Sequence, residues 1–133
     1  MKRINLLMLI MLIVSSSAFS QSKNKSVEVL YFKAKQCACK TRACNALENQ
    51  VKTIIGENFP DTNIGFKRVW LNDKENAGLI EKYQAKPQTV VLVKTRRKKE
   101  WNTDLSEPVK NLKVRGKTET AQANLKTLIA ENL

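Results

Sequence analysis

The 133-residue sequence contains no histidine. This absence excludes, within the chain, Cys-His nucleophilic catalysis, Ser-His-Asp triads and mixed Cys/His zinc sites, because each of them needs an imidazole. Only three cysteines are present, Cys37, Cys39 and Cys44, and they lie within eight residues. Reactive chemistry is therefore expected in that short stretch.

Aromatic residues are scarce, at 6% of the chain, although the net charge is +12. A protein this basic is a candidate for nucleic-acid binding. Proteins that bind single strands interleave aromatic side chains with basic ones, whereas the aromatic residues here are few and scattered. The sequence therefore predicts no nucleic-acid partner. It also contains no flavin or nicotinamide fingerprint, so no cofactor is expected.

The densest basic run covers residues 95–99, between an apolar run at residues 90–93 and Trp101. A hairpin turn is expected there. Lysines in such a turn keep an edge strand from pairing with another chain, and this solvated role is the favoured interpretation. Docking to an acidic partner or an anionic surface is the alternative.

No apolar run approaches the roughly 20 residues that a membrane-spanning helix needs. The longest run, residues 6–14, follows a basic head and precedes three serines. Small side chains at Ala18 and Ser20 then precede Gln21. This pattern predicts a signal peptide at residues 1–20 that is cleaved before Gln21. We expect an exported protein, periplasmic or extracellular, with no stable membrane anchor after cleavage.

A linker at residues 21–26 is expected to lead into one domain at residues 27–133, because the chain is long enough for one core and too short for two. β-Branched and aromatic residues predict a first strand at residues 27–32. Apolar residues then recur three or four positions apart from Cys44 to Ile55, which predicts a helix over residues 41–58 with one buried face. The residues expected to be buried together are Leu47, Val51, Ile54, Val91, Leu125 and Leu128.

The remaining elements follow in an order that is typical of an α/β fold. Ser106 is expected to cap a helix that has Pro108 in its first turn. Helical crossovers predict that the first three strands are parallel, and a hairpin makes the sheet mixed. The order fits a thioredoxin-like α/β fold, a three-layer sandwich with a mixed central sheet. Its later elements are a strand at residues 64–70, a short helix at 75–84, a strand at 89–93 with a hairpin partner at 99–104, and a helix at 118–132.

The cysteines stand between the first strand and the first helix, where thioredoxin-like proteins keep their redox cysteines. The free N–H groups at a helix N-terminus stabilise a thiolate. The leading hypothesis is thus a thiol–disulfide oxidoreductase whose partner is a protein thiol or disulfide. Cys37 or Cys39 would attack from an exposed loop, and Cys44, on the apolar face of the helix, would be the sheltered resolving thiol.

A binding module is the alternative from another class. Three thiolates suit a soft metal or metalloid such as copper(I), zinc or trivalent arsenic, although a closed structural zinc site would need a fourth ligand. One structural disulfide with a buried free cysteine is the third interpretation. The clustering opposes it, because a disulfide that closes a short loop contributes little stability.

Segments along nearly the whole mature chain carry a family resemblance. They are Tyr31-Phe32, Cys37-Ala38-Cys39-Lys40, residues 44–48, residues 72–76 with Tyr83, residues 90–93, residues 99–102 and Asp104-Leu105. Together they resemble the small thioredoxin-like proteins catalogued as the nitrophenyl-compound nitroreductase subunit ArsF. The resemblance implies a redox accessory subunit that docks on a larger reductase.

Five residues bear on what the resemblance implies for the site. Members of that family carry an arginine-cysteine-x-x-cysteine loop, and Gln36 stands here where the arginine would be. Either Cys37 and Cys39 are the pair with one residue deleted, or Cys44 is the second cysteine after an enlarged loop. Thioredoxin-fold proteins also carry a cis-proline before the third strand, and Pro87 is the candidate for it, with an ordinary trans turn proline as the alternative.

Overall fold

The computed structural model describes residues 25–35 and 38–133, and for residues 38–40 it describes the backbone only. The expected signal peptide and Cys37 lie outside the described residues. Within them, no helix is long and apolar enough to cross a membrane. The elements are β1 (Lys25–Lys33), α2 (Ala38–Asn58), β2 (Ile64–Trp70), η1 (Lys74–Asn76), α3 (Ala77–Lys82), β3 (Val90–Arg96), β4 (Lys99–Asp104), α4 (Ser106–Asn111) and α5 (Thr118–Glu131).

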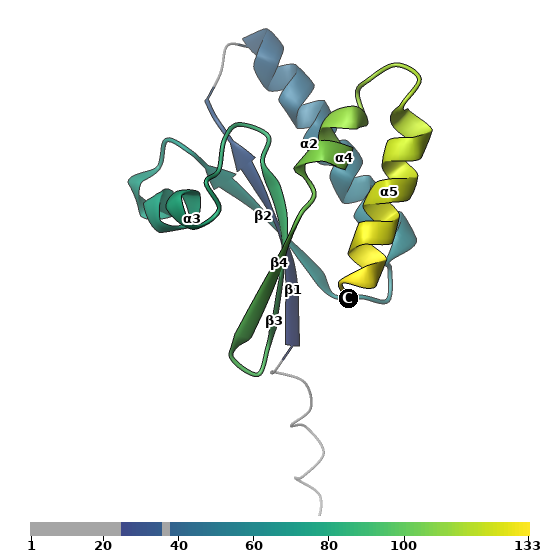
Figure 1. Ribbon diagram of the computed structural model, residues 1–133. Coiled ribbons are helices and arrows are strands. Elements are labelled where there is room, and N and C mark those ends of the chain that lie inside the picture. Colours follow the sequence, from purple (N-terminus) through teal and green to yellow (C-terminus); the bar gives the residue numbers. More distant parts are fainter. Residues whose placement is uncertain (1–24, 36–37) are drawn as a thin grey trace, which may run out of the picture.

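The four strands form one mixed sheet in the order β2-β1-β3-β4 (Figure 1). β1 is parallel to β2 and antiparallel to β3, and β3 is antiparallel to β4. The expectation that the third strand is parallel to the first two is therefore wrong. The six residues of α3 span only about 9 Å, so this helix cannot carry the chain back across a strand of about 23 Å.

Helices cover both faces of the sheet, which confirms the expected three-layer α/β sandwich with a mixed central sheet. The side chains of Val29 and Leu92 point toward α2, α4 and α5, whereas Phe32 and Val91 point toward α3. Figure 1 shows α3 apart from the other helices, on the opposite side of the sheet. Val91 is buried but belongs to the α3 layer, not to the larger core, and Leu128 is only partly buried.

The first helix begins earlier than its predicted start at residue 41. α2 starts at Ala38, so that Cys39 lies in its first turn and not in the preceding loop. Alanine and lysine at positions 38 and 40 are good helix formers, and no glycine or proline interrupts the chain before Gly56. The predicted apolar stripe is confirmed, because the side chains of Cys44, Leu47, Val51, Ile54 and Ile55 are all buried.

Ser106 does not cap α4, contrary to the sequence-based expectation. It is the first residue of the helix, and Leu105 occupies the cap position without a side-chain hydrogen bond. The Ser106 hydroxyl instead accepts a hydrogen bond of 2.9 Å from the backbone N–H of Val90. Asp104 takes the role of acceptor at the helix start, since its Oδ1 receives the Ser106 N–H at 2.8 Å.

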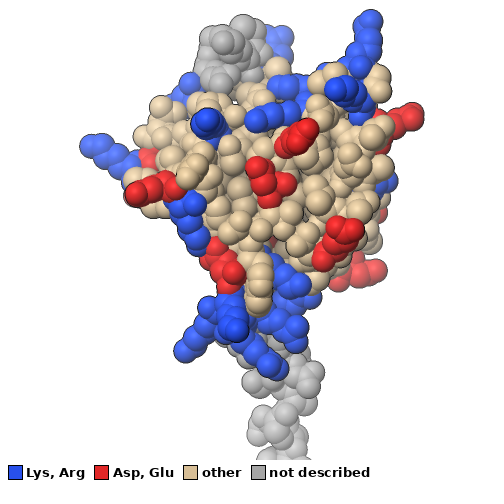
Figure 2. Space-filling model, in the orientation of Figure 1, with Lys and Arg blue, Asp and Glu red and all other residues tan. Residues whose placement is uncertain are grey.

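Charge is unevenly distributed over the surface of the domain. Figure 2 shows lysine and arginine side chains gathered near the start of α2 and again around the turn between β3 and β4. The carboxylates lie mainly between these two ends in the same view.

Candidate functional site

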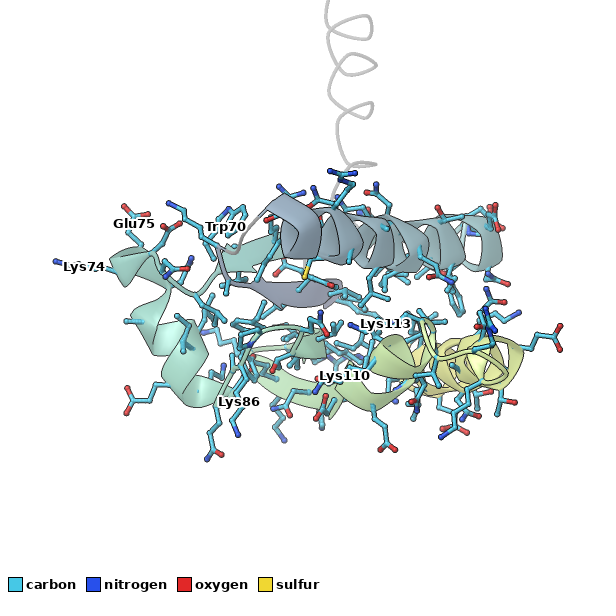
Figure 3. The ribbon with its side chains drawn as sticks, turned by 90° about the horizontal axis from the view of Figure 1, so that it is seen from above. Trp70, Lys74, Glu75, Lys86, Lys110 and Lys113 are labelled. Carbon is cyan, nitrogen blue, oxygen red and sulfur yellow. The ribbon has the colours of Figure 1, made fainter. Side chains whose placement is uncertain are left out.

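The candidate site lies at the edge of the sheet where the parallel strands β1 and β2 end. β1 ends at Lys33, β2 ends at Trp70, and α2 begins above them at Ala38. We call this region the cysteine edge. Figure 3 looks onto it, with Trp70 beside α2 and the lysines Lys110 and Lys113 on the opposite side. Open α/β sheets place their ligand sites at such carboxyl ends of strands.

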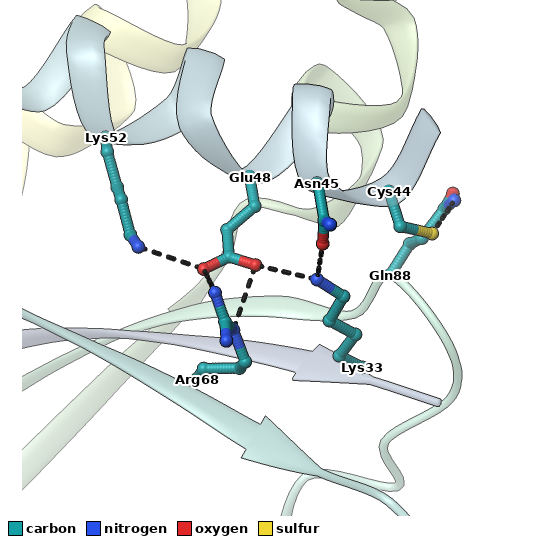
Figure 4. Close-up of polar contacts among 7 residues, drawn as sticks. All are labelled: Lys33, Cys44, Asn45, Glu48, Lys52, Arg68 and Gln88. Carbon is teal, nitrogen blue, oxygen red and sulfur yellow. Dashed lines mark hydrogen bonds and ion pairs between the residues drawn. The ribbon is translucent and has the colours of Figure 1, made fainter. Parts of the chain in front are cut away.

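Two of the three cysteines lie within the described residues. Cys39 is in the first turn of α2, and Cys44 follows in its second turn. The expected burial of Cys44 is confirmed, with 5% of the residue exposed. Its Sγ accepts a hydrogen bond from the amide Nε2 of Gln88 at 3.5 Å (Figure 4).

The helical position of Cys39 limits which cysteines can pair. Residues five positions apart in an α-helix have Cα atoms about 8.7 Å apart, whereas a disulfide needs a Cα separation below about 7 Å. Cys39 and Cys44 therefore cannot form a disulfide while the first turns of α2 are intact. Cys37 and Cys39 are two positions apart, so their Cα atoms are within about 7 Å in any backbone conformation.

A buried carboxylate lies one helical turn after Cys44. Glu48 is fully buried and receives three cations, which Figure 4 shows around its two oxygens. Lys33 Nζ and Lys52 Nζ are each 3.0 Å from a carboxylate oxygen, and Arg68 Nη2 is 2.8 Å away. Arg68 Nε also donates to both oxygens at 3.0 Å. The cluster thus carries two positive charges in excess.

The register of the sheet brings this cluster together. Lys33 pairs with Trp70 across β1 and β2, and Tyr31 pairs with Arg68 two positions earlier. All four side chains therefore share the face below α2. The Trp70 ring lies 5.5 Å from Lys33 Nζ and 5.7 Å from Arg68 Cζ, within the range of cation–π contacts.

The charged partners of Glu48 were not found from the sequence. Glu48 itself lies one turn after Cys44, on the predicted apolar stripe of α2, and a charged residue there is a signal of a buried partner. Lys33 has the same parity as Val29 and Tyr31, which also predicts an inward side chain. That Arg68 joins them depends on the pairing of β1 with β2, which no local pattern specifies.

The three cations control the ionisation of Glu48. Burial alone would raise its pKa, but the hydrogen bonds from Arg68, Lys52 and Lys33 outweigh burial and lower the pKa from 4.5 to about 2. Glu48 therefore remains charged over nearly the whole accessible pH range. Its charge fixes the position of Lys33, whose Nζ also donates to the side-chain oxygen of Asn45.

Acid should unfold the domain partly through Glu48. Because the folded pKa is depressed, the contribution of Glu48 is fully present above the unfolded value of 4.5 and is lost as pH falls toward about 2. The shift corresponds to about 3 kcal/mol of unfolding free energy. Urea unfolding across this pH range should show that loss in the wild type and a smaller one in Glu48→Gln. A Glu57→Gln variant, changed at an exposed position of the same helix, should keep the wild-type profile.

Tyr31 places an unpaired hydroxyl in the same interior. Its side chain is fully buried, and among the described residues its oxygen is the buried side-chain polar atom without a hydrogen-bond partner. Burial raises the pKa of Tyr31, and the charges of Cys44 and Glu48 raise it further. A buried hydroxyl without a partner costs about 1–3 kcal/mol. Tyr31 therefore offers an unused donor close to Cys44.

Gln88 holds its amide over Cys44 from a strained turn. Its φ is +68°, in the left-handed region that residues other than glycine rarely adopt. The turn is closed by the Thr89 N–H, which donates to the Lys86 carbonyl at 3.0 Å. The side-chain oxygen of Gln88, Oε1, accepts a hydrogen bond from Lys113 Nζ at 3.0 Å.

Pro87 is trans, because the described residues contain no cis peptide bond. Of the two alternatives left open for Pro87, the cis-proline is therefore wrong and the trans turn proline is present. The physical reason is the turn itself: proline occupies the second position and Gln88, with positive φ, the third, which is the type II arrangement with a trans bond. Gln88, and not a proline, is the residue that faces Cys44 from this loop.

No group of three or more metal-ligating side chains is found in the part of the chain that the structure describes. Cys37 lies outside that part, and nothing is described of the Cys39 side chain. The soft-metal alternative therefore stays a prediction from the sequence.

Comparisons with known proteins assign no family to this arrangement. No protein-family model matches the sequence, and no curated protein matches it. Among solved structures, the chain is similar to one described as the structure of a malarial protein, with 24% identity and a TM-score of 0.35. That similarity covers 59% of this chain and 80% of the other. A likeness this low carries no argument about activity, so function is inferred from the site's own residues.

Proposed function

We propose that the protein carries out thiol–disulfide exchange, with Cys37 and Cys39 as its redox pair. One observation carries the proposal: Cys39 lies in the first turn of α2, and lysine and arginine side chains gather near this helix start (Figure 2). The positive end of a helix and neighbouring cations both stabilise a thiolate. A thiolate is the species that attacks a disulfide.

The exchange proceeds in two balanced steps. One thiol of the pair loses its proton to solvent and, as a thiolate, attacks a sulfur of the substrate disulfide. A mixed disulfide forms, and the other substrate sulfur leaves as a thiolate that takes up a proton from solvent. The second thiol of the pair then loses its proton and attacks the mixed disulfide, which releases the second substrate thiol. The substrate is reduced by two electrons, and Cys37 and Cys39 are oxidised to a disulfide. A reducing dithiol of a partner protein restores the pair by the reverse exchange.

Cys44 has a different role in this proposal from the one expected from the sequence. The expectation that it resolves the mixed disulfide assumed that Cys39 lay in a loop. With Cys39 in α2, Cys44 reaches it only if the first turns of the helix open. We propose that Cys44 stays reduced in the folded protein, held by Gln88 and close to Tyr31.

The resemblance to the ArsF subunit family supports a larger reductase as the partner. The lysines at the cysteine edge, among them Lys86, Lys110 and Lys113 (Figure 3), would meet acidic groups on such a partner. The proposed compartment is outside the cytoplasm, where exposed thiol pairs meet disulfides.

Three serine variants test the proposal. Replacing the attacking cysteine, Cys37 or Cys39, should reduce disulfide reduction to the background rate. Replacing its partner should trap mixed disulfides with substrate, which non-reducing electrophoresis and mass spectrometry detect. Cys44→Ser is the matched control in the same segment, and it should retain activity and form no trapped complex.

Other outcomes of this experiment would contradict the proposal. A wild-type protein that does not reduce any disulfide substrate would contradict the proposed redox function. A metal adduct that protects all three thiols from alkylation, and that each serine variant weakens, would favour the soft-metal binding module. Trapping by Cys44→Ser would show that Cys44 belongs to the reactive pair.

A further inference from the structure

The turn between β3 and β4 concentrates positive charge far from the cysteine edge. Six cations gather there, four from three strands and two from the turn, and we call this region the hairpin end. Figure 2 shows this cluster at the lower end of the molecule. Its residues are Lys25, Lys94, Arg96, Arg97, Lys98 and Lys99.

The strand register places like charges directly opposite one another. Lys25 pairs with Arg96 across β1 and β3, and Arg96 pairs with Lys99 across β3 and β4. Like charges in opposed positions destabilise a sheet. None of the six cations forms an ion pair within residues 25–35 and 38–133. The nearby Glu100 is bound by Lys82 at 2.6 Å instead.

The turn itself is strained by the same residues. Arg97 and Lys98 have φ values of +49° and +66°, which are those of a two-residue type I′ hairpin turn. Such turns strongly favour Asn-Gly, because asparagine and glycine tolerate positive φ. Non-glycine residues that are held in this region mark functional segments. The sequence therefore keeps two cations at the tip at a cost to folding.

An exposed tryptophan lies beside these charges. Trp101 is 49% exposed and is opposite Lys94 across β3 and β4. Together with Arg96, Glu131 and Asn132 they line a pocket of about 220 Å³. Indole rings next to lysine and arginine are typical of surfaces that lie at the headgroup level of a membrane.

We propose that the hairpin end docks reversibly on an anionic lipid bilayer. Trp101 favours a bilayer over an acidic protein, since the cations alone would suit either. β1 also begins at this end, at Lys25, which pairs with Arg96 next to the hairpin turn. Docking here would leave the cysteine edge, at the other end of β1, facing the aqueous phase.

The test measures binding of the full chain to vesicles of phosphatidylcholine alone and of phosphatidylcholine mixed with phosphatidylglycerol. The readout is the ratio of the two affinities, compared between variants, because any contribution of the N-terminal segment is the same in each of them. Wild type should prefer the anionic vesicles, and added salt should weaken that preference. In a Trp70→Phe background, Trp101 is the remaining tryptophan, and its emission should shift to shorter wavelength on binding.

The decisive variant is Arg97→Asn with Lys98→Gly. It removes two charges and installs the favoured turn, so it should lower the anionic preference about 25-fold, at about fivefold per charge, while raising the midpoint of thermal unfolding. Lost binding then cannot be due to lost folding. Lys74→Gln with Lys110→Gln removes two exposed charges from η1 and α4, outside the hairpin, and should change the ratio little.

Three outcomes would overturn the proposal. The first is a wild type that does not distinguish the two kinds of vesicle. The second is a hairpin variant that keeps the wild-type ratio, which would place any membrane contact elsewhere. The third is binding to polyglutamate without any preference for anionic vesicles, which would assign the hairpin end to an acidic protein.

Discussion

Replacing Glu48 by glutamine should lower the free energy of unfolding by about 3–5 kcal/mol, the usual cost of removing one partner of a buried ion pair. Lys33 is 3% exposed, and its Nζ cannot turn to solvent when the carboxylate is neutralised. An unpaired ammonium in the interior is far more costly than the loss of a surface ion pair. This loss is a large part of the free energy of unfolding of a domain of ordinary stability.

Two further variants decide whether burial is the cause. Lys52→Gln removes a cation from the same carboxylate, but the Lys52 side chain is 43% exposed, so the loss should stay below about 1 kcal/mol. Lys33→Met combined with Glu48→Leu removes both buried charges and should recover most of the stability. Urea unfolding measures all three. Equal losses for Glu48→Gln and Lys52→Gln would show that the cluster is not a buried ion pair.

Truncating Leu125 to alanine should cost about 2–5 kcal/mol, because the side chain is fully buried between α5 and the sheet and its removal leaves a cavity. Leu128, three residues later on the same helix, is only partly buried. Leu128→Ala should therefore cost about half as much or less.

Urea unfolding of these two variants tests the orientation of α5 with matched chemistry, since each loses the same atoms from one helix. A larger loss for Leu128→Ala than for Leu125→Ala would contradict the packing described above. The unfolding slope should stay constant in both variants, because neither changes the surface that unfolding exposes.

The elements themselves could be predicted from the sequence because their signals are local. The three-to-four spacing from Cys44 to Ile55 requires a helix that buries one face, and the structure has it. The hairpin between β3 and β4 follows in the same way from two β-like runs around a basic turn. The four apolar residues at positions 90–93 fill both faces of a central strand, so their pattern could not show that Val91 belongs to the α3 layer.

Features set by contacts between distant segments were not predictable. The direction of β3 depends on α3, which is shorter than the helix expected at residues 75–84 and does not carry the chain back along the sheet. The meeting of Lys33, Glu48 and Arg68 depends on the register of β1 with β2. Gln88 faces Cys44 because its own φ in the turn is positive. Neither a glutamine nor the preceding proline predicts that conformation from the sequence.

The cysteines were identified as the candidate site from their clustering alone, but their pairing was not. The helix α2 begins three residues earlier than predicted, so Cys39 lies in the helix and not in a loop. This position changes which cysteines can pair. The start of a helix depends on the residues on both sides of it. The apolar stripe predicts only the buried part of α2, and that part begins at Cys44.

The most direct test of the proposed exchange is disulfide mapping of the oxidised protein, combined with alkylation rates of the reduced, folded and metal-free protein. We predict that peptide mass spectrometry finds Cys37 linked to Cys39 and Cys44 as a free thiol. In the reduced protein, Cys44 should alkylate more slowly than the other two, because it is 5% exposed. A disulfide that contains Cys44, or equal alkylation rates of all three thiols, would contradict the proposed exchange.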